Sequence, residues 1–175
     1  MTDPATTIRA ALEESGTEYD QPDEHTFVVS LPGERKLKTA CALVVGAHSV
    51  SVNAFVARNP DENHAEVYRW LLERNARMYG VSFAVDHHGD IYLTGRVALH
   101  AITPDEVDRV LGAVLEYSDS AFNTILELGF ASAIRKEYAW RTSRGESTIN
   151  LAAFRHLTGE PDPGTPSSTD QTGAP

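Results

Sequence analysis

Hydrophobic residues first follow a helical period along this chain and then change to strand-like alternation. The pattern predicts a helix over residues 4–15, which Gly16 ends. Segments rich in Val and Phe follow, separated by Pro-Gly and Gly-Ala-His turn signals. They predict an antiparallel meander of three strands near residues 26–31, 36–45 and 49–58.

A wide apolar stripe predicts a second helix over residues 61–79. We expect it to cover a sheet with Val67, Trp70, Leu71, Arg74 and Met78, and with Tyr68, Leu72 and Tyr79 beside them. A hairpin over residues 81–85 and 91–99 follows, and then a third helix from Thr103 that continues or restarts toward Gly129. The order α-β-β-β-α-β-β-α predicts an α+β fold, an antiparallel sheet flanked by helices.

Local signals sharpen the boundaries of these elements. Asp3-Pro4, Asn59-Pro60 and Thr103-Pro104 each combine a capping residue with proline at the first helical position, and a Glu follows the second and third caps at capping-box spacing. Gly112 inside the third helix costs about 1 kcal/mol relative to Ala, so we expect another backbone, either that of the sheet or that of a symmetry-related second subunit, to approach it closely. Gly95 inside a strand predicts a bulge or a close-packed neighbour.

Several motifs occur together in the order of one known family: Tyr68 to Asn75, Gly80 to Phe83, Gly89 to Arg96, Asp105 to Gly112, Phe122-Asn123 and Leu126 to Phe130. With these motifs, about residues 5–130 resemble the actinobacterial YbjN-domain proteins. The resemblance implies a fold like that of type III secretion chaperones, often dimeric. Members of the family are described as sensory transduction regulators, and the resemblance carries no catalytic residues.

Charge divides the chain into three parts. The whole sequence has 25 acidic and 15 basic residues, net −10, which excludes a general polyanion binder. Residues 1–130 carry net −10, residues 131–157 net +3, and residues 158–175 net −3. We therefore expect an α+β domain over 1–130, a basic aromatic helical arm over 131–157 and, from its Pro, Gly, Ser and Thr content, a disordered polar tail over 158–175.

The same composition predicts a cytoplasmic protein with no membrane partner. The longest apolar run, residues 40–47, is far shorter than the ~20 residues of a membrane helix, and no export signal is visible. The single cysteine, Cys41, has no partner for an internal disulfide and is expected to be a buried thiol.

The basic arm combines arginine with aromatic side chains, and its candidate partner-binding residues are Tyr138, Trp140, Arg141 and Arg144. Such residues dominate protein interfaces, and they also form single-stranded nucleic-acid platforms. Three interpretations stay open: the arm packs on its own body or exchanges with a second subunit, binds another protein, or binds nucleic acid. The acidic body argues against nucleic acid. We predict a non-enzymatic regulatory or chaperone-like protein-binding module that forms a homodimer.

One loop has residues that could ligate a metal ion, because residues 86–90 are Asp-His-His-Gly-Asp. Adjacent histidines on an extended chain point to opposite faces, and Asp and Gly favour turns, so we expect a hairpin turn with no metal and no cofactor. The alternative is a small-molecule or metal-dependent enzyme that uses the Asp86 to Asp90 loop. No nucleophile elbow or phosphate-binding glycine loop occurs, which favours a protein without catalytic residues.

Overall fold

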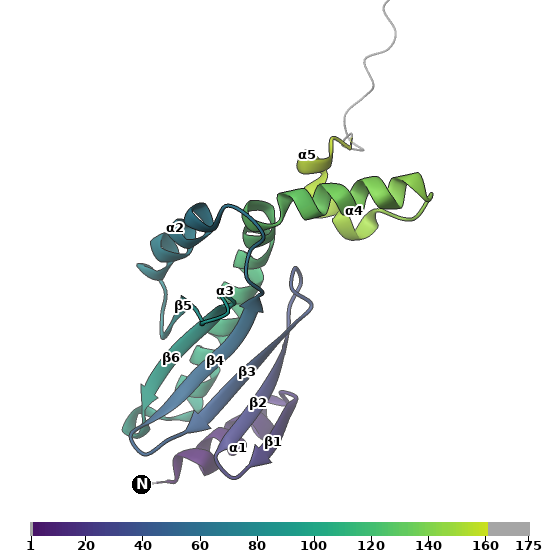
Figure 1. Cartoon of the computed structure of the whole chain (residues 1–175). Coiled ribbons are helices and arrows are strands. Elements are labelled where there is room, and N and C mark those ends of the chain that lie inside the picture. Colours follow the sequence, from purple (N-terminus) through teal and green to yellow (C-terminus); the bar gives the residue numbers. More distant parts are fainter. Residues whose placement is uncertain (1, 161–175) are drawn as a thin grey trace, which may run out of the picture. The chain divides into compact units, whose positions relative to one another are not determined.

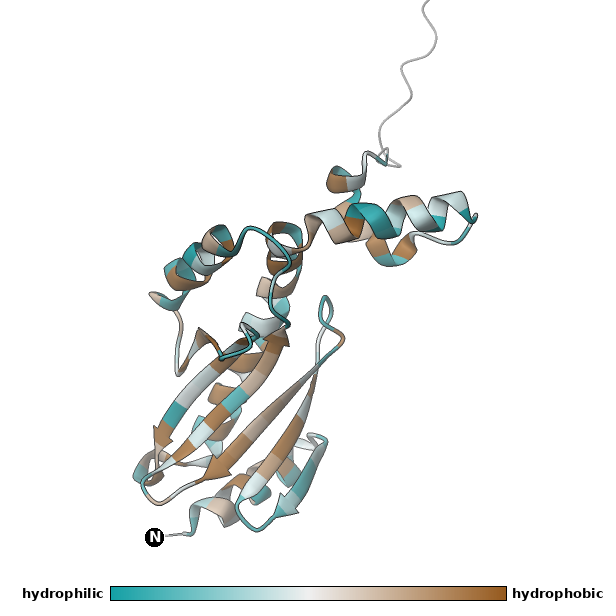
Figure 2. Cartoon of the chain, viewed as in Figure 1, coloured by the Kyte–Doolittle hydropathy of each residue, from teal (hydrophilic) through white to brown (hydrophobic). Residues whose placement is uncertain are grey.

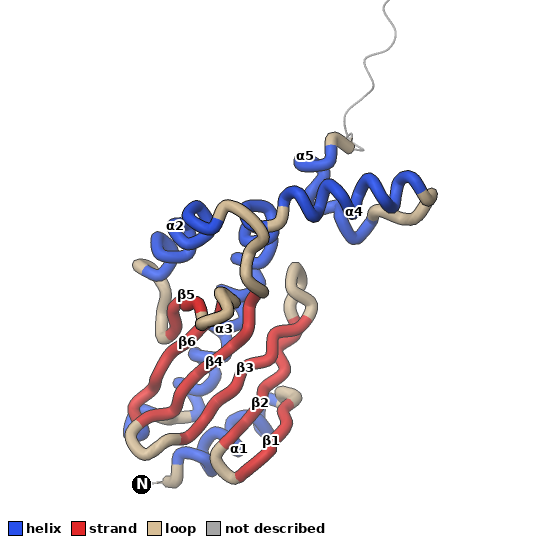
Figure 3. Tube along the Cα trace, in the orientation of Figure 1, coloured by secondary structure: helices blue, strands red, loops and turns tan. Residues whose placement is uncertain are grey.

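The structure, a computed structural model, describes residues 2–160. They form two compact units, of which unit 1 ends at Gly129 and unit 2 begins at Phe130. The elements of unit 1 (Figures 1 and 3) are α1 (Pro4–Ser15), β1 (Tyr19–Asp23), β2 (Thr26–Pro32), β3 (Lys38–Val45), β4 (Ser49–Ala57), α2 (His64–Asn75), β5 (Val81–Val85), β6 (Ile91–Ala98), a 3₁₀ turn (Leu99–Ala101) and α3 (Pro104–Gly129).

The six strands form one antiparallel sheet in the order β1-β2-β3-β4-β6-β5. Strands β2, β3 and β4 are the predicted meander, and β5 and β6 are the predicted hairpin. Helices α1 and α3 lie behind the sheet in Figure 1, and α3 packs on α1, β2, β3, β4 and β5. The expected fold class, an α+β protein with helices on an antiparallel sheet, is confirmed.

Strand alternation gives the sheet one buried face and one open face. A ladder of paired residues crosses five strands on the buried face: Val29, Cys41, Ala54, Leu93 and Phe83. The next ladder faces the other side and is exposed or half-exposed: Val28, Ala42, Asn53, Thr94 and Ser82. Figure 2 shows strongly hydrophobic residues along the strands and also on the helices. Unit 1 therefore has its core between the sheet and the two helices.

The Cys41 thiol lies in that core. Its side chain has no exposed surface, and burial raises its pKa to about 12, against a weaker lowering effect from the backbone of Asn53. The expected buried thiol is confirmed, and Cys41 is in a protonated, unreactive state at neutral pH. No helix in the described part of the chain combines the length and apolar character that a bilayer span requires.

Two helices, α1 and α3, follow the sequence signals at their ends closely. Helix α1 begins after Asp3, whose carboxylate accepts a hydrogen bond from the Thr6 N–H at 3.0 Å, and it ends at Gly16 with φ of 67°. Helix α3 begins after Thr103, whose hydroxyl accepts from the Glu106 N–H at 3.1 Å, and it runs unbroken to Gly129. Local capping chemistry therefore determines both starts.

The predicted start of the second helix at Asn59-Pro60 is wrong. Helix α2 begins after Asn63, which has φ of 54°. The Asn59 backbone N–H donates to Asp90 Oδ1 at 2.8 Å, and its side-chain amide donates to the His88 carbonyl at 2.9 Å. Asn59 therefore holds the β5–β6 turn and does not cap a helix. Its backbone and side-chain N–H groups are both hydrogen-bonded in that turn, whereas a helix cap would use only its side-chain oxygen.

Strand β1 was not predicted, so the element order has four strands before α2 instead of three. Its five residues include Pro22 and two acids, and it shows no apolar alternation. Pairing with β2 holds it, with Tyr19 opposite Val29, and the Tyr19 ring lies 6.0 Å from the Phe27 ring. Tertiary contacts, not local propensity, make this segment a strand.

The loop between β2 and β3 is held to α3 by Asp119. Its carboxylate oxygen Oδ1 accepts from the N–H of Arg35 at 2.7 Å and of Lys36 at 2.9 Å. Burial raises the pKa of Asp119, but backbone hydrogen bonds from Lys36, Arg35 and Glu34 outweigh burial and lower the pKa below its usual range. The ionised carboxylate is therefore the form that fixes this loop.

Unit 2 is helical over its described residues: α4 (Ala131–Ser143), a 3₁₀ helix (Ile149–Phe154) and α5 (Arg155–Thr158). The structure begins this unit at Phe130, while the predicted arm begins at 131. The predicted boundaries of the three parts of the chain stay predictions. Of the expected tail, residues 161–175 lie outside the described part of the chain.

Candidate functional site

An apolar groove lies between α2 and the edge strand β5. Its volume is about 290 Å³, and its lining residues are Tyr68, Leu71 and Leu72 from α2 and Phe83, Ala84 and Val85 from β5. Leu72 is 67% exposed and Val85 is 47% exposed. Large aliphatic side chains with that much exposed surface, gathered in one groove, are typical of a site that buries them against a ligand or partner.

The groove forms because α2 is attached to the rest of unit 1 by only part of its surface. Val67 and Leu71 are its buried residues, and the helix packs on α3 and β5. The prediction that its wide stripe covers a sheet is wrong, since Leu72 stays exposed and Trp70 and Arg74 are half-buried. The excess width of the stripe was the sequence signal for this groove.

Asn75 closes the backbone edge of β5 beside the groove. Its amide group donates to the Phe83 carbonyl at 3.1 Å, and its carbonyl accepts from the Phe83 N–H at 2.7 Å. These are the two bonds that an added strand would make at the middle of β5. The opposite edge, β1, has Pro22 between two acids, a composition that also discourages strand pairing. The groove is therefore suited to apolar side chains, not to an additional strand.

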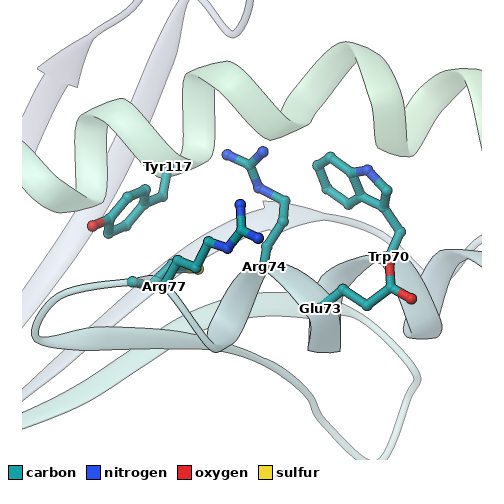
Figure 4. Close-up of a pocket in the computed structure, with 6 residues that line it drawn as sticks. Trp70, Glu73, Arg74, Arg77 and Tyr117 are labelled. Atoms are coloured by element: carbon teal, nitrogen blue, oxygen red, sulfur yellow. The ribbon is translucent and has the colours of Figure 1, made fainter.

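A second hollow, of about 330 Å³, lies on the other side of α2, between that helix and α3. Figure 4 shows Arg74 and Arg77 pointing into it between Trp70 and Tyr117. The two hollows share α2 as a wall, and they differ in chemistry because one is apolar and the other carries two guanidinium groups.

The four residues predicted as partner-binding all lie on α4 or at its end. The structure brings Trp140 and Arg144 together, with the Arg144 guanidinium 4.9 Å from the indole ring. Trp140 is 49% exposed. Arg141 forms an ion pair with Glu137 and donates to the Ser147 carbonyl at 3.2 Å. It thereby holds the end of α4, while Trp140 and Arg144 form the exposed part of the predicted set.

Tyr138 is half-buried, and the charge of Arg144 is also met within unit 2, because its Nε donates to Glu146 at 3.0 Å. The arginines of the arm are thus partly neutralised by their own neighbours. The partner-binding role of these residues, and docking of the arm on its own body or on a second subunit, stay predictions.

The loop of residues 86–90 is a turn, as predicted. The Asp86 carboxylate accepts from the N–H groups of His88 at 2.9 Å and Asp90 at 3.0 Å, and Gly89 has φ of 82°. The argument that the two histidines point apart is wrong, since their rings lie 3.8 Å apart in this turn. Among the described residues, no group of three or more His, Cys, Asp or Glu side chains converges on a possible metal position.

The sheet order and the helices behind it define the class of this protein: an α+β protein with a type III secretion chaperone-like fold. Its structure is similar to a chain in the crystal structure of the ExsC-ExsE complex, with a TM-score of 0.50 and 16% sequence identity, covering 67% of this chain and 89% of that chain. The YbjN family model, described as "Putative bacterial sensory transduction regulator", matches residues 4–127, and the chain belongs to that family.

Relatives in mycobacteria share more of the sequence. The chain is 57% identical over 155 residues to an uncharacterized protein of Mycobacterium tuberculosis, covering 86% of this chain and 85% of the relative. An uncharacterized protein of Mycobacterium leprae is 56% identical over 155 residues, covering 86% and 84%. Because unit 1 ends at residue 129, these matches extend into unit 2. The resemblance to actinobacterial YbjN-domain proteins is confirmed.

Proposed function

We propose that this chain is a protein-binding regulator and not an enzyme, and that the groove between α2 and β5 binds an apolar segment of a partner protein. The observation that carries the proposal is the exposure of Leu72 and Val85 in an apolar groove beside a closed strand edge. The family description names a regulator, and the structural neighbour with the same fold is a protein complex by its title. Both support a role in binding protein.

The partner segment is an amphipathic helix that places apolar side chains in the groove and basic residues around it. A helix fits because Asn75 already occupies the bonding groups of Phe83, which removes the main gain of strand addition. Basic flanks fit because residues 1–130 carry net −10. We place this activity in the cytoplasm, in keeping with the buried free thiol of Cys41.

A synthetic helix tests the groove directly. The probe is a fluorescein-labelled 18-residue Leu/Lys amphipathic helix, and binding is followed by fluorescence anisotropy. We expect Leu72→Ser to weaken binding about 10-fold or more, because a buried Leu side chain contributes about 1.5–3 kcal/mol. Leu37→Ser is the matched control, since Leu37 is 81% exposed and does not line the groove.

The comparison with Leu37→Ser shows whether the peptide binds in the groove. Equal weakening by Leu72→Ser and Leu37→Ser would show that the peptide binds without using the groove, and the proposal would fail. A Leu/Glu helix of the same pattern is expected to bind more weakly than the Leu/Lys helix, because it meets the acidic unit 1 with like charge. Tighter binding of the Leu/Glu helix would contradict the proposed basic partner.

We further propose a homodimer in which unit 2 contributes Tyr138, Trp140, Arg141 and Arg144. A half-exposed Trp140 stacked with Arg144 is typical of residues buried at interfaces. Light scattering is expected to give twice the chain mass of 19.1 kDa for the full chain and the monomer mass for Trp140→Ala combined with Arg144→Ala. A monomer mass for the unaltered chain, or an unchanged dimer in the variant, would contradict this role of the arm.

A further inference from the structure

The hollow between α2 and α3 is lined by two arginines, Arg74 and Arg77. Arg74 and Arg77 extend into it from α2 and the residues after it, and Tyr117 enters from α3 (Figure 4). Trp70 and Met78 contribute apolar surface to the wall of the hollow. The volume of about 330 Å³ lies within the range of small-molecule pockets, about 300–1,000 Å³.

Arg74 is held in place before any ligand arrives. Its Nη2 donates to Ser120 Oγ at 3.0 Å, and its guanidinium carbon lies 4.7 Å from the Trp70 ring. Its Nε is buried and has no hydrogen-bond partner among the described residues. A fixed arginine whose donors are not all used is preorganised to bind an acceptor.

No carboxylate of the described residues forms an ion pair with either arginine. Glu73 lines the same hollow, but its carboxylate accepts from Arg69 Nε at 3.0 Å and points away from the two guanidinium groups (Figure 4). Four of the other six arginines of unit 1 form ion pairs, as Arg58 does with Asp61. In a chain with 25 acids and 15 bases, two cations left together without a counter-ion mark a place for an external anion.

Tyr117 forms the end of the hollow opposite Trp70 (Figure 4). Its hydroxyl points away from the two guanidinium groups (Figure 4), and the hydroxyl oxygen accepts from the Tyr79 N–H at 2.9 Å. The donors available in the hollow are therefore the two guanidinium groups, which are typical of sites that recognise carboxylate or phosphate oxygens.

We propose that this hollow binds the oxyanion group, carboxylate or phosphate, of a small molecule whose apolar part packs on Trp70 and Met78. The inference is independent of partner binding in the apolar groove, because the two hollows share no lining residue. Arg74 and Arg77 bind the oxyanion charge, and the Tyr117 ring forms one end of the hollow.

Tryptophan fluorescence can report this site alone. The sequence has two tryptophans, so Trp140→Phe leaves Trp70 as the sole tryptophan, which is excited selectively at wavelengths that the tyrosines do not absorb. In that background, phenylacetate, inorganic phosphate and the neutral phenylacetamide are titrated at constant ionic strength. We expect a saturable change in Trp70 emission with phenylacetate, with phosphate or with both, and no saturable change with phenylacetamide. The anion that saturates identifies the source, carboxylate or phosphate.

Variants that remove one charge at a time then show which arginines bind the anion. Arg77→Gln and Arg74→Gln are each expected to weaken anion binding about 10-fold or more. Arg96→Gln removes the same charge from exposed Arg96, which does not line the hollow, and is expected to stay within about twofold of the parent. Arg77 is itself exposed, so its variant is expected to fold even if Arg74→Gln does not.

Absence of saturable binding by either anion would overturn the proposal. So would equal binding of phenylacetamide and phenylacetate, or equal weakening by Arg77→Gln and Arg96→Gln. None of these results bears on the Leu/Lys helix, whose binding is measured separately.

Discussion

Phe27→Ala is expected to lower the free energy of unfolding by about 3–5 kcal/mol, as for other fully buried phenylalanines. Phe27 has no exposed surface and lies on β2, against the Tyr19 ring of β1 and below Arg9 of α1. Its removal opens a cavity where three elements meet, and the neighbours cannot fill that cavity without moving the sheet. Urea unfolding followed by circular dichroism measures the loss.

Phe55→Ala is the matched control for this prediction. Phe55 has the same side chain, but it lies on the open face of the sheet and is 40% exposed. We expect a smaller loss, about 1–2 kcal/mol, because the ring is only partly buried, against Tyr92 and Lys36, and its removal leaves no closed cavity. Equal losses at Phe27 and Phe55 would contradict the assignment of one buried and one open face.

Gly95→Ala is expected to destabilise the chain by about 3 kcal/mol, at the upper end of the cost of overpacking. A Cβ at Gly95 on β6 would collide with the carbonyl oxygen of Gly80 and lie 3.0 Å from Val81 Cγ1. Backbone atoms cannot rotate away, so the start of β5 must shift. The same shift disturbs the groove, because β5 forms one of its walls, and binding of the Leu/Lys helix is expected to weaken as well.

Gly112→Ala provides the control with the opposite sign. Gly112 is exposed on α3, and an added Cβ would meet no heavy atom within 4 Å beyond its own helix backbone. We expect a gain of about 0.5–1 kcal/mol from the better helix propensity of Ala. Thermal unfolding of both variants measures the difference. A loss of stability in Gly112→Ala, or none in Gly95→Ala, would contradict these placements.

The two glycines also show where sequence reasoning succeeds and where it stops. The close neighbour predicted for Gly95 is present. At Gly112 the expected approach of the sheet is wrong, and an approach by a second subunit stays a prediction. A glycine in a strand and a glycine in a helix both lower the stability of that element. The sequence does not say whether a neighbour offsets that cost, because the neighbour comes from a distant segment.

Some boundaries of helices and strands could be predicted from local sequence, and others depend on distant residues. The ends of α1 were predictable because Asp3 and Gly16 act within one turn of the helix. The start of α2 was not, because Asn59 bonds to residues about 30 positions away in the β5–β6 turn. Strand β1 was missed because its pairing with β2, and not its own composition, holds it in the sheet.

The candidate site was only partly predictable. Leu72 and Arg74 were identified within an apolar stripe, but the sequence offered a covered sheet as the simpler explanation. Their real setting depends on the packing of α2 on α3 and β5, which leaves one hollow on each side of the helix. Asn75 carried no sequence signal, because its role depends on its distance from Phe83.

The most direct test of the central claim is hydrogen–deuterium exchange of the full chain with and without a saturating amount of the Leu/Lys helix. Binding in the groove predicts slower exchange of backbone amides in α2 and β5, residues 64–75 and 81–85. The open face of β2 and β3 is expected to be unchanged. Slower exchange there or in unit 2, with α2 and β5 unchanged, would contradict the account.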